Sequence, residues 1–265
     1  MPRIIPVDSI DDPRIECYTR LKERDLAASG RRFIAEGELV VRRLLASRYA
    51  VESVLVSSRK VERIAPLAGE QTLIYTAAPE MVSRIVGFEF HSGVMAVGVR
   101  GQPLRVAEAA RFWSDRRQLT LMILPEISKT DNLGALLRVG AAFGVDAVIL
   151  GERCCNPFYR QAVRVSMGAV FELPVVESDD LLRDIGFLRE NCAVQCAATV
   201  VDADAVPLRS FRRGPRLGVL FGNESQGLSA EYVRACDVRL TIPMRRNVDS
   251  LNVAVAAGVV MYALT

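Results

Sequence analysis

Histidine is almost absent from this chain of 265 residues, which contains only His91. A hydrolase of the Ser-His-Asp type needs a histidine between its nucleophile and its carboxylate, and zinc sites are usually built from several His and Cys ligands. No Cys or His lies at metal-ligand spacing from His91. The sequence therefore disfavours both classes and predicts no metal site.

The six cysteines form no disulfide or metal-binding framework. Cys154 and Cys155 are adjacent, Cys192 and Cys196 are separated by three residues, and no further pair completes a tetrahedral site. We interpret the cysteines as free thiols of a protein in a reducing compartment, which predicts a cytoplasmic location.

Long apolar runs are also missing. The longest, residues 253–265, is shorter than the ~20 residues of a membrane span, and its small alanines favour a buried helix. Residues 1–8 lack the apolar core of a secretion signal and already include an acidic residue. We expect a protein that is neither exported nor embedded in a membrane.

Lysine is rare, with Lys22, Lys60 and Lys129 the only examples among 34 basic residues. The formal net charge is only +3, so composition alone does not identify a nucleic-acid partner. Arginine nevertheless suits phosphate, because its planar guanidinium donates two hydrogen bonds to one anion. Clusters of basic residues that would permit an RNA partner lie at residues 20–24, 31–32, 42–43, 209–216 and 245–246.

The composition is otherwise that of an ordinary globular protein, with half of the residues hydrophobic and a quarter charged. A chain of this length is compatible with two domains. Residues 101–103, Gly-Gln-Pro, break the pattern of apolar segments, and the next strongly apolar run begins at Leu119. We predict domains at residues 1–100 and 119–265, joined by a linker at residues 101–118.

Both predicted domains alternate helices and strands. In the first, we expect helices at residues 38–47, 59–67 and 79–86 and strands at 51–56, 72–75 and 93–99. In the second, we expect strands at 119–124, 147–150, 171–175, 193–198, 217–221 and 238–242, and helices at 132–143, 158–167, 180–190, 229–235 and after residue 249. Several strands are apolar throughout, which indicates an α/β fold with a mostly parallel sheet and a site at the carboxyl ends of its strands.

The first segment that carries chemistry follows a predicted buried strand and reads Lys-Thr-Asp-Asn-Leu-Gly-Ala-Leu-Leu-Arg at residues 129–138. Its leucines recur on one helix face that packs on the sheet, so Arg138 points elsewhere. A surface ion pair would explain Arg138 equally well from this segment alone. Asn132 lies where a helix cap is expected, and capping is an equally good explanation of it.

The second segment runs from a strand into a polar loop, Gly-Val-Leu-Phe-Gly-Asn-Glu-Ser-Gln-Gly-Leu-Ser, at residues 218–229. Glycines let a ligand approach backbone N–H groups, so this loop could hold a nucleotide-like molecule. It is not a Walker loop, and no G-x-G-x-x-G follows a strand. A plain turn also explains Gly222 and Gly227, whereas Glu224 at the carboxyl end of a strand favours a site.

The third segment is Ile-Pro-Met-Arg-Arg-Asn-Val-Asp-Ser-Leu-Asn-Val-Ala at residues 242–254. Asp249 and Ser250 are good helix N-caps, and small apolar residues form a stripe after them. A capped core helix explains the stripe. It does not explain Asn252, because a polar amide that enters such a helix should have a specific partner.

Together and in this order, the three segments resemble the signature motifs of the SpoU (TrmH) family of RNA ribose 2′-O-methyltransferases, in the SPOUT superfamily: N-x-G-x-x-x-R, F-G-N-E-x-x-G-L and I-P-M-x(5)-S-L-N-V-A-x-A. The similarity covers about residues 119–265. Residues 164–169, Arg-Val-Ser-Met-Gly-Ala, resemble the family's S-x-G-A stretch. Residues 31–37, Arg-Arg-Phe-Ile-Ala-Glu-Gly, resemble the start of the L30e-like RNA-binding domain found in many members.

The resemblance implies a C-terminal SPOUT domain with a deep trefoil knot, a small N-terminal L30e-like domain and a homodimer. It implies S-adenosylmethionine as the cofactor, bound in a bent form by the loops of the knot. The residues that match the family's cofactor contacts are Gly222, Ile242, Leu251, Asn223, Met244 and Thr199. The residues that match its catalytic or substrate-positioning places are Arg138, Asn132, Glu224, Ser250 and Asn252, with Arg138 serving a site completed by the partner chain.

Methyl transfer to oxygen is an in-line displacement that requires no metal, so the enzyme must align the acceptor and help remove its proton. A free guanidinium is effectively always protonated and is a poor base. We therefore hypothesise that Arg138 binds the phosphate beside the target ribose and stabilises charge on the 2′-oxygen. Glu224 or a water would assist the departure of the proton.

Other substrates and classes stay open at this point. An L30e-like domain favours 23S rRNA, tRNA is the alternative, and a base nitrogen is a less favoured acceptor because the Ser-Leu-Asn stretch is typical of the ribose branch. A non-catalytic RNA-binding protein would show decayed motifs. A doubly wound oxidoreductase would need a Gly-rich first βα turn, which Leu-Pro-Glu-Ile-Ser at residues 124–128 does not supply.

Overall fold

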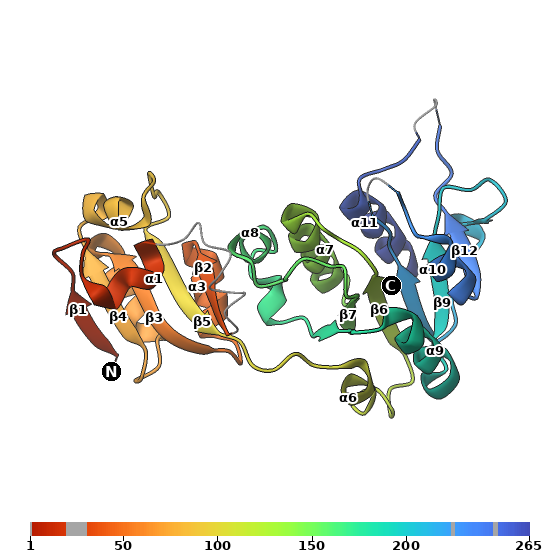
Figure 1. The fold of residues 1–265 in the computed structure, drawn as a ribbon, viewed down its shortest axis with the longest axis horizontal. Coiled ribbons are helices and arrows are strands. Elements are labelled where there is room, and N and C mark those ends of the chain that lie inside the picture. Colours follow the sequence, from red (N-terminus) through yellow and green to blue (C-terminus); the bar gives the residue numbers. More distant parts are fainter. Residues whose placement is uncertain (1, 20–30, 224–225, 246–248) are drawn as a thin grey trace. The chain divides into compact units, whose positions relative to one another are not determined.

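The structure is a computed structural model that describes residues 2–19, 31–223, 226–245 and 249–265. The chain folds into two units, each with its own sheet (Figure 1). The first unit comprises Met1–Gln102 and Asn156–Glu172, and the second comprises Pro103–Cys155 and Leu173–Thr265.

The first unit contains a mixed five-stranded sheet of order β1-β4-β3-β5-β2. The outer strands β1 and β2 are additions to the predicted set. The first three strands in that order run parallel, and β5 pairs antiparallel with both β3 and β2. The strands are β1 (Arg3–Pro6), β2 (Arg32–Glu36), β3 (Ala50–Ser57), β4 (Leu73–Ala77) and β5 (Val94–Val99).

Short helices connect these strands. The helix predicted at residues 59–67 is three short pieces, because Pro66 lacks the N–H that a continuous helix would use. Among the described residues, the helices of this unit are η1 (Pro13–Ile15), α1 (Glu16–Thr19), α3 (Glu38–Leu45), η2 (Ser58–Lys60), α4 (Val61–Ile64), η3 (Ala65–Leu67), α5 (Pro79–Val86), α8 (Arg160–Val165) and η4 (Ala169–Phe171).

An aromatic cluster holds the distant segment 156–172 in the first unit. The rings of Phe33, Tyr49, Phe158 and Phe171 have centroids 5.0 to 5.9 Å apart. Phe33 lies against Gly98 on the neighbouring strand, where an added Cβ would come within 2.2 Å of the ring. The strand predicted at residues 171–175 is therefore wrong, since Phe171 ends a 3₁₀ helix in this cluster and the strand begins only at Val175.

The second unit contains a seven-stranded sheet of order β10-β12-β9-β11-β6-β7-β8, in which every pairing is parallel. The predicted α/β class with a mostly parallel sheet is confirmed. The strands are β6 (Leu119–Leu124), β7 (Ala147–Leu150), β8 (Val175–Glu177), β9 (Gln195–Thr199), β10 (Val206–Pro207), β11 (Arg216–Leu220) and β12 (Val238–Thr241); a 3₁₀ turn, η5 (Leu208–Ser210), follows β10.

Helices cover both faces of this sheet (Figure 1). On one face, α6 (Val106–Ala110), α9 (Leu181–Cys192) and α10 (Ala230–Ala235) share a core cluster with strand residues that include Leu121, Ile149 and Cys196. On the other, α7 (Thr130–Ala142) places Gly140 against Val148 and packs on α11 (Val253–Leu264). Alternate residues of a strand point to opposite faces, so a wholly apolar strand is the expected consequence.

The predicted linker at residues 101–118 contains α6. Val106, Ala109 and Trp113 of this segment are buried in the core between α9 and the sheet. These residues therefore add to the second unit in the structure, beginning at Pro103.

Arg213 ties together the amino-terminal edge of the second sheet and the end of α11. Its five N–H groups all have acceptors, and burial lowers the pKa of its guanidinium. The acceptors are the Thr120 hydroxyl and the backbone oxygens of Leu119, Gly214, Pro215 and Leu264, at 2.7 to 3.2 Å. This side chain fixes where α11 ends relative to β6.

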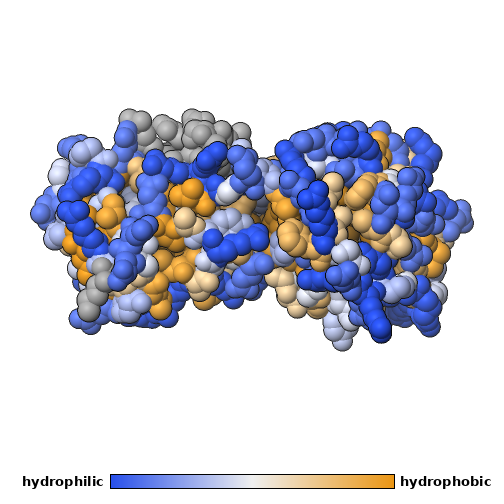
Figure 2. All heavy atoms as spheres, turned by 90° about the horizontal axis from the view of Figure 1, so that it is seen from below, coloured by the Kyte–Doolittle hydropathy of each residue, from blue (hydrophilic) through white to orange (hydrophobic). Residues whose placement is uncertain are grey.

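The surface is mixed, and on the face shown in Figure 2 hydrophilic side chains surround small apolar groups. On α11, Val255, Val259 and Tyr262 are 53%, 41% and 78% exposed and recur at helical spacing. No helix within the described ranges is long and apolar enough to cross a membrane.

Candidate active site

A pocket of about 430 Å³ lies at the carboxyl edge of the seven-stranded sheet. The segments that follow β9, β11 and β12 form it together with the start of α11. Its volume is typical of small-molecule sites. All six residues predicted to contact the cofactor line this pocket: Thr199, Gly222, Asn223, Ile242, Met244 and Leu251. Ser250 lines it as well.

The loop after β11 closes on itself beside the pocket. The N–H of Asn223 donates to the oxygen of Gly227 at 3.0 Å, and the N–H of Gly227 donates back at 2.8 Å. A Cβ on Gly222 would lie 2.2 Å from the carbonyl carbon of Gly227, and Gly227 has a φ of 68°. Both glycines are thus required by the turn, which the sequence allowed as an alternative. The predicted catalytic residue Glu224 lies outside the described residues.

Thr199 joins two strands of the pocket. Its hydroxyl donates a hydrogen bond of 2.7 Å to the backbone oxygen of Leu220, so it connects the ends of β9 and β11. The hydroxyl is already engaged in this bond. Thr199 therefore shapes the pocket wall at the point where the two strands end.

Asn252 has the specific partner that its sequence context requires. Its Oδ1 accepts from the N–H groups of Ala254 at 2.9 Å and Val255 at 3.4 Å, which makes it the N-cap of α11. Its Nδ2 donates to Oδ1 of Asn132 at 3.1 Å. Two predicted catalytic residues, 120 positions apart, are therefore in contact.

The predicted helix caps Asp249, Ser250 and Asn132 are wrong. The helix expected after Asp249 begins only at Val253, because Asn252 has the extended backbone that an N-cap adopts, with ψ at 140°. Asn132 is not a cap either, since α7 begins at Thr130 and Lys129 is its N-cap. Asn132 instead lies in the first turn of α7, from which its side chain reaches Asn252.

Arg138 is exposed on α7. The leucines and Gly140 of this helix are buried against the sheet, as the periodicity predicts. No residue of the described ranges forms an ion pair or hydrogen bond with Arg138, so the interpretation as a surface ion pair has no support in this part of the chain. Within the described ranges, no hydrogen bond or ion pair joins Arg138 to another predicted site residue.

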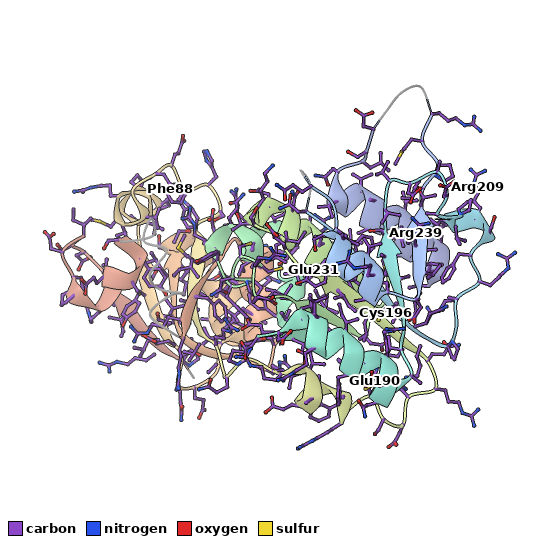
Figure 3. All side chains as sticks on the ribbon, turned by 45° about the vertical axis from the view of Figure 1, so that its right-hand side comes forward. Phe88, Glu190, Cys196, Arg209, Glu231 and Arg239 are labelled. Atoms are coloured by element: carbon purple, nitrogen blue, oxygen red, sulfur yellow. The ribbon has the colours of Figure 1, made fainter. Side chains whose placement is uncertain are left out.

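Glu126 and Arg153 support the pocket loop and were missed from the sequence. Nδ2 of Asn223 lies 3.4 Å from Oε1 of Glu126, and Nε of Arg153 lies 3.4 Å from Oε2 of the same carboxylate. Arg153 also lies 3.8 Å from Glu231 on α10, which Figure 3 labels, and a hydrogen bond with Tyr232 raises the pKa of Arg153. The available signal was an acidic residue directly after an apolar strand, at the carboxyl edge.

Thiol and metal chemistry find no support at this edge. Cys154 donates from Sγ to the oxygen of Leu124 at 3.0 Å, and burial raises its pKa to about 12. A protonated thiol is a weak nucleophile. None of the six cysteines forms a disulfide, and within the described ranges no cluster of His, Cys, Asp and Glu could hold a metal ion.

The donors and walls of the pocket fit a nucleoside-like cofactor. The walls include the apolar side chains of Leu208, Leu240 and Val260. Among the residues that the structure describes, none hydrogen-bonds to the backbone N–H groups of Ile242 and Leu251. Apolar walls with a few unpaired polar groups are typical of sites that bind flat heteroaromatic rings.

A parallel α/β sheet with such a pocket at its carboxyl edge defines a class of protein, the enzymes and binding proteins that hold nucleotide-like cofactors. The family model of the SpoU rRNA Methylase family matches residues 120–262. An uncharacterized tRNA/rRNA methyltransferase of Mycobacterium bovis is 34% identical over 263 residues, which cover 96% of this chain and 89% of that protein. The chain belongs to the SpoU rRNA methylase family.

Two further relatives agree with this membership. A 23S rRNA (guanosine-2′-O-)-methyltransferase of Acinetobacter baylyi is 28% identical over 190 residues, 71% of this chain and 76% of that protein. The AdoMet-bound rRNA methyltransferase from Sinorhizobium meliloti has a TM-score of 0.82 at 25% identity, covering 98% of this chain and 97% of that one. The predicted family is confirmed, and SpoU methyltransferases use S-adenosylmethionine, as predicted. The protein is an S-adenosylmethionine-dependent RNA methyltransferase.

Proposed function

We propose that this enzyme methylates a ribose 2′-hydroxyl and that its substrate is 23S rRNA. The observation that carries the proposal is that all six predicted cofactor residues and Ser250 line one pocket. Asn252, two residues after Ser250, is hydrogen-bonded to Asn132. The name of the Acinetobacter baylyi relative supports both the acceptor and the RNA. The Mycobacterium bovis relative is named for tRNA or rRNA, so tRNA is the second candidate.

The cofactor supplies an electrophilic methyl group on a positively charged sulfur. In our proposal the apolar wall of the pocket holds the adenine, and the backbone N–H groups of Ile242 and Leu251 bind its polar edge. Gly222 and Gly227 keep the loop closed around it. The chain must then hold the 2′-oxygen in line with the methyl group and assist loss of its proton.

Arg138 is the residue to which we assign stabilisation of the negative charge in the reaction. Its exposed guanidinium can bind the phosphate beside the target ribose and stabilise negative charge that develops on the 2′-oxygen. Glu224, which lies outside the described residues, or a water would take the proton. A guanidinium is not the base in this scheme, because it stays protonated.

A homodimer would bring Arg138 to a second pocket. Val255, Val259 and Tyr262 form an exposed apolar face on α11, and α7, which carries Arg138, packs beside that helix. Apolar faces of this kind usually mark protein interfaces. Pairing through α11 would therefore set Arg138 of one protomer near the pocket of its partner.

The remaining parts of the proposal concern the whole chain. Residues 119–265 form a SPOUT domain with a trefoil knot, residues 1–100 form an L30e-like domain that selects the RNA, and the protein acts in the cytoplasm. The support is the sequence resemblance together with the two separate sheets. The arginine clusters of the first unit supply phosphate contacts, which position an RNA without reading its sequence.

The test is incubation with labelled S-adenosylmethionine and separately isolated 23S rRNA, 16S rRNA and tRNA from a strain that lacks the gene. We expect label on a 2′-O-methylated nucleotide of 23S rRNA, mapped by nuclease digestion and mass spectrometry. Label on a base nitrogen, or on no RNA, would contradict the proposal. Label on tRNA alone would select the second candidate.

Arg138→Ala and Arg138→Lys test the assigned residue at saturating cofactor. We expect a single-turnover rate lower by about 100-fold for alanine, the size of effect seen when one donor to a developing oxyanion is removed. Lysine keeps the charge without the planar pair of donors, so its rate should be intermediate. Binding of S-adenosylmethionine by calorimetry should be unchanged. Near-normal rates in both variants would show that Arg138 is not catalytic.

A further inference from the structure

One edge of the first unit carries an exposed aromatic ring. The carboxyl ends of β2 and β3 meet there with the start of β5, since Glu36 pairs with Met95 and Val56 pairs with Val94. Phe88, which Figure 3 labels, follows α5 in the loop that leads to β5. Its side chain is 38% exposed. Its ring contacts Phe90 edge-on at 5.6 Å.

Three cations surround one carboxylate at the same edge. Glu38, the first residue of α3, lies 3.1 Å from Lys60, 3.2 Å from Arg42 and 2.7 Å from Arg63. The hydrogen bond from Lys60 is the largest cause of the lowered pKa of Glu38. One carboxylate leaves two of these three charges uncompensated. Lys60 also donates to the oxygen of Ser92 at 2.8 Å, which ties the cations to the loop that carries Phe88.

A fourth cation lies over the ring itself. The guanidinium of Arg160 is 5.3 Å from the centroid of Phe88, and its Nε forms an ion pair of 3.6 Å with Oε2 of Glu36, which offsets its charge. Among the described residues, six buried side-chain polar atoms have no hydrogen-bond partner, and four belong to residues of this edge. These four are Glu36 Oε2, Arg42 Nε, Ser92 Oγ and Arg160 Nη1.

The positive charge left over at Glu38, beside an exposed ring, indicates an anionic and aromatic ligand. Nucleotides combine these properties, because a base stacks on an aromatic ring while its phosphates meet cations. Bases inside a duplex already stack on each other, so only an unpaired base can use such a ring. A protein partner would need a broader apolar surface. In α3 and the loop between α5 and β5, the exposed large apolar residues are Leu39 and Phe88.

We propose that this edge binds an unpaired nucleotide of the RNA substrate, with its base on Phe88 and the neighbouring phosphates on Arg42, Arg63 and Lys60. The inference rests on the proposed function, because it assumes that the substrate is RNA, and it adds that the recognised part is single-stranded. It also assigns the first unit a binding step that is separate from the methyl-transfer pocket.

The test uses the full-length protein and a twelve-nucleotide RNA that contains 2-aminopurine, as a single strand and as a duplex. We expect the single strand to bind more tightly and its fluorescence to be quenched by stacking. Phe88→Ala and Phe88→Leu should weaken single-strand binding about 5- to 160-fold, the range for losing one stacked base. Phe88→Trp should restore it. Phe112→Ala removes a ring that is 71% exposed in the second unit and is the matched control, with no change expected.

The cations are tested by salt dependence. Arg42→Ala with Arg63→Ala should lower the slope of log affinity against log salt by about 1.4, or ~0.7 for each lost phosphate contact to a single strand. The thermal midpoint of each variant checks the fold, and Phe88→Leu keeps apolar volume without an aromatic face. Wild-type affinity in both Phe88→Ala and Phe88→Leu, or equal affinity for duplex and single strand, would overturn the inference.

Methylation of 23S rRNA separates this inference from the proposed function. In Phe88→Leu we expect a higher KM for the RNA, with kcat at saturating RNA and the affinity for S-adenosylmethionine unchanged. If the wild type methylates RNA and the Phe88 variants keep its KM, the stacking inference alone is wrong. If Phe88 controls binding of the probe while no RNA is methylated, the stacking inference stands and the proposed function is wrong.

Discussion

Asn252 performs two separable tasks, and substitutions can tell them apart. Oδ1 caps α11 through two backbone N–H groups, and Nδ2 bonds to Asn132. Loss of an N-cap asparagine costs about 1 kcal/mol. Loss of an exposed side-chain hydrogen bond adds ~0.5 kcal/mol. Asn252→Ala should therefore destabilise the second unit by about 1.5 kcal/mol, because it removes both.

Asn252→Asp keeps the cap and should be nearly neutral. A carboxylate accepts the same two N–H bonds, and its charge at a helix N-terminus stabilises by about 0.3–1 kcal/mol. The lost donor is offset, since the amide of Asn132 can turn and donate to the new carboxylate. We expect a stability within ~0.5 kcal/mol of the wild type.

Calorimetric unfolding of the three proteins without cofactor measures the difference. For a unit of this size, about 1.5 kcal/mol corresponds to a fall in Tm of roughly 3–6 °C. The transition to follow is the one that S-adenosylmethionine shifts upward, because only that unit contains the pocket. If Asn252→Asp melts as low as Asn252→Ala, or if neither differs from the wild type, Asn252 does not stabilise α11 as its cap.

Two further predictions concern a glycine and a thiol. Gly222→Ala should weaken S-adenosylmethionine binding at least about 10-fold in a calorimetric titration, because its Cβ would meet the backbone at Gly227. The control is Gly186→Ala in helix α9, whose Cβ meets nothing within 4 Å and which should stabilise the folded protein by about 0.5–1 kcal/mol. An unchanged affinity in Gly222→Ala would refute the closed loop. Burial raises the pKa of Cys196 to about 12, so the stability contributed by its neutral thiol is complete below the unfolded pKa of about 8.5 and is lost as pH rises towards the folded value. Urea titrations should show a smaller fall in stability for Cys196→Ala than for the wild type, by about 1.6 kcal/mol between pH 8.5 and 10. Parallel pH curves would contradict this.

The parts of the fold that could be read from the sequence are those with a local cause. β6 is buried at every position, and the sequence places it at the same residues as the structure. β1 is mostly exposed, so no apolar pattern in the sequence predicts it. The sequence predicts a strand at residues 171–175, whereas the contact of Phe171 with Phe33, 138 positions earlier, decides the conformation at its start. Local periodicity contains no information about such a partner.

The site divides in the same way. Motif positions identified Gly222, Met244 and the other predicted pocket residues except Thr199, because their order along the chain is specific. Thr199 lies outside the motifs and was named from the family resemblance alone. The bond between Asn132 and Asn252 could not be predicted, since it depends on two helices starting side by side. Glu126 lies outside all three motifs. Its role depends on the loop after β11 ending within reach of the loop after β6.

These two contacts explain how three segments of sequence become one site. The bond between Asn132 and Asn252 connects the first and third segments, and Glu126, just before the first segment, reaches Asn223 in the second. Both contacts start from the loop after β6 and the helix that follows it. Because β6 lies beside β11 in the sheet, a displacement of the loop after β6 would disturb the loop after β11 and the cap of α11 together. Cofactor affinity and the stability of α11 should consequently change together when Glu126 or Asn132 is altered, even though neither residue lines the pocket.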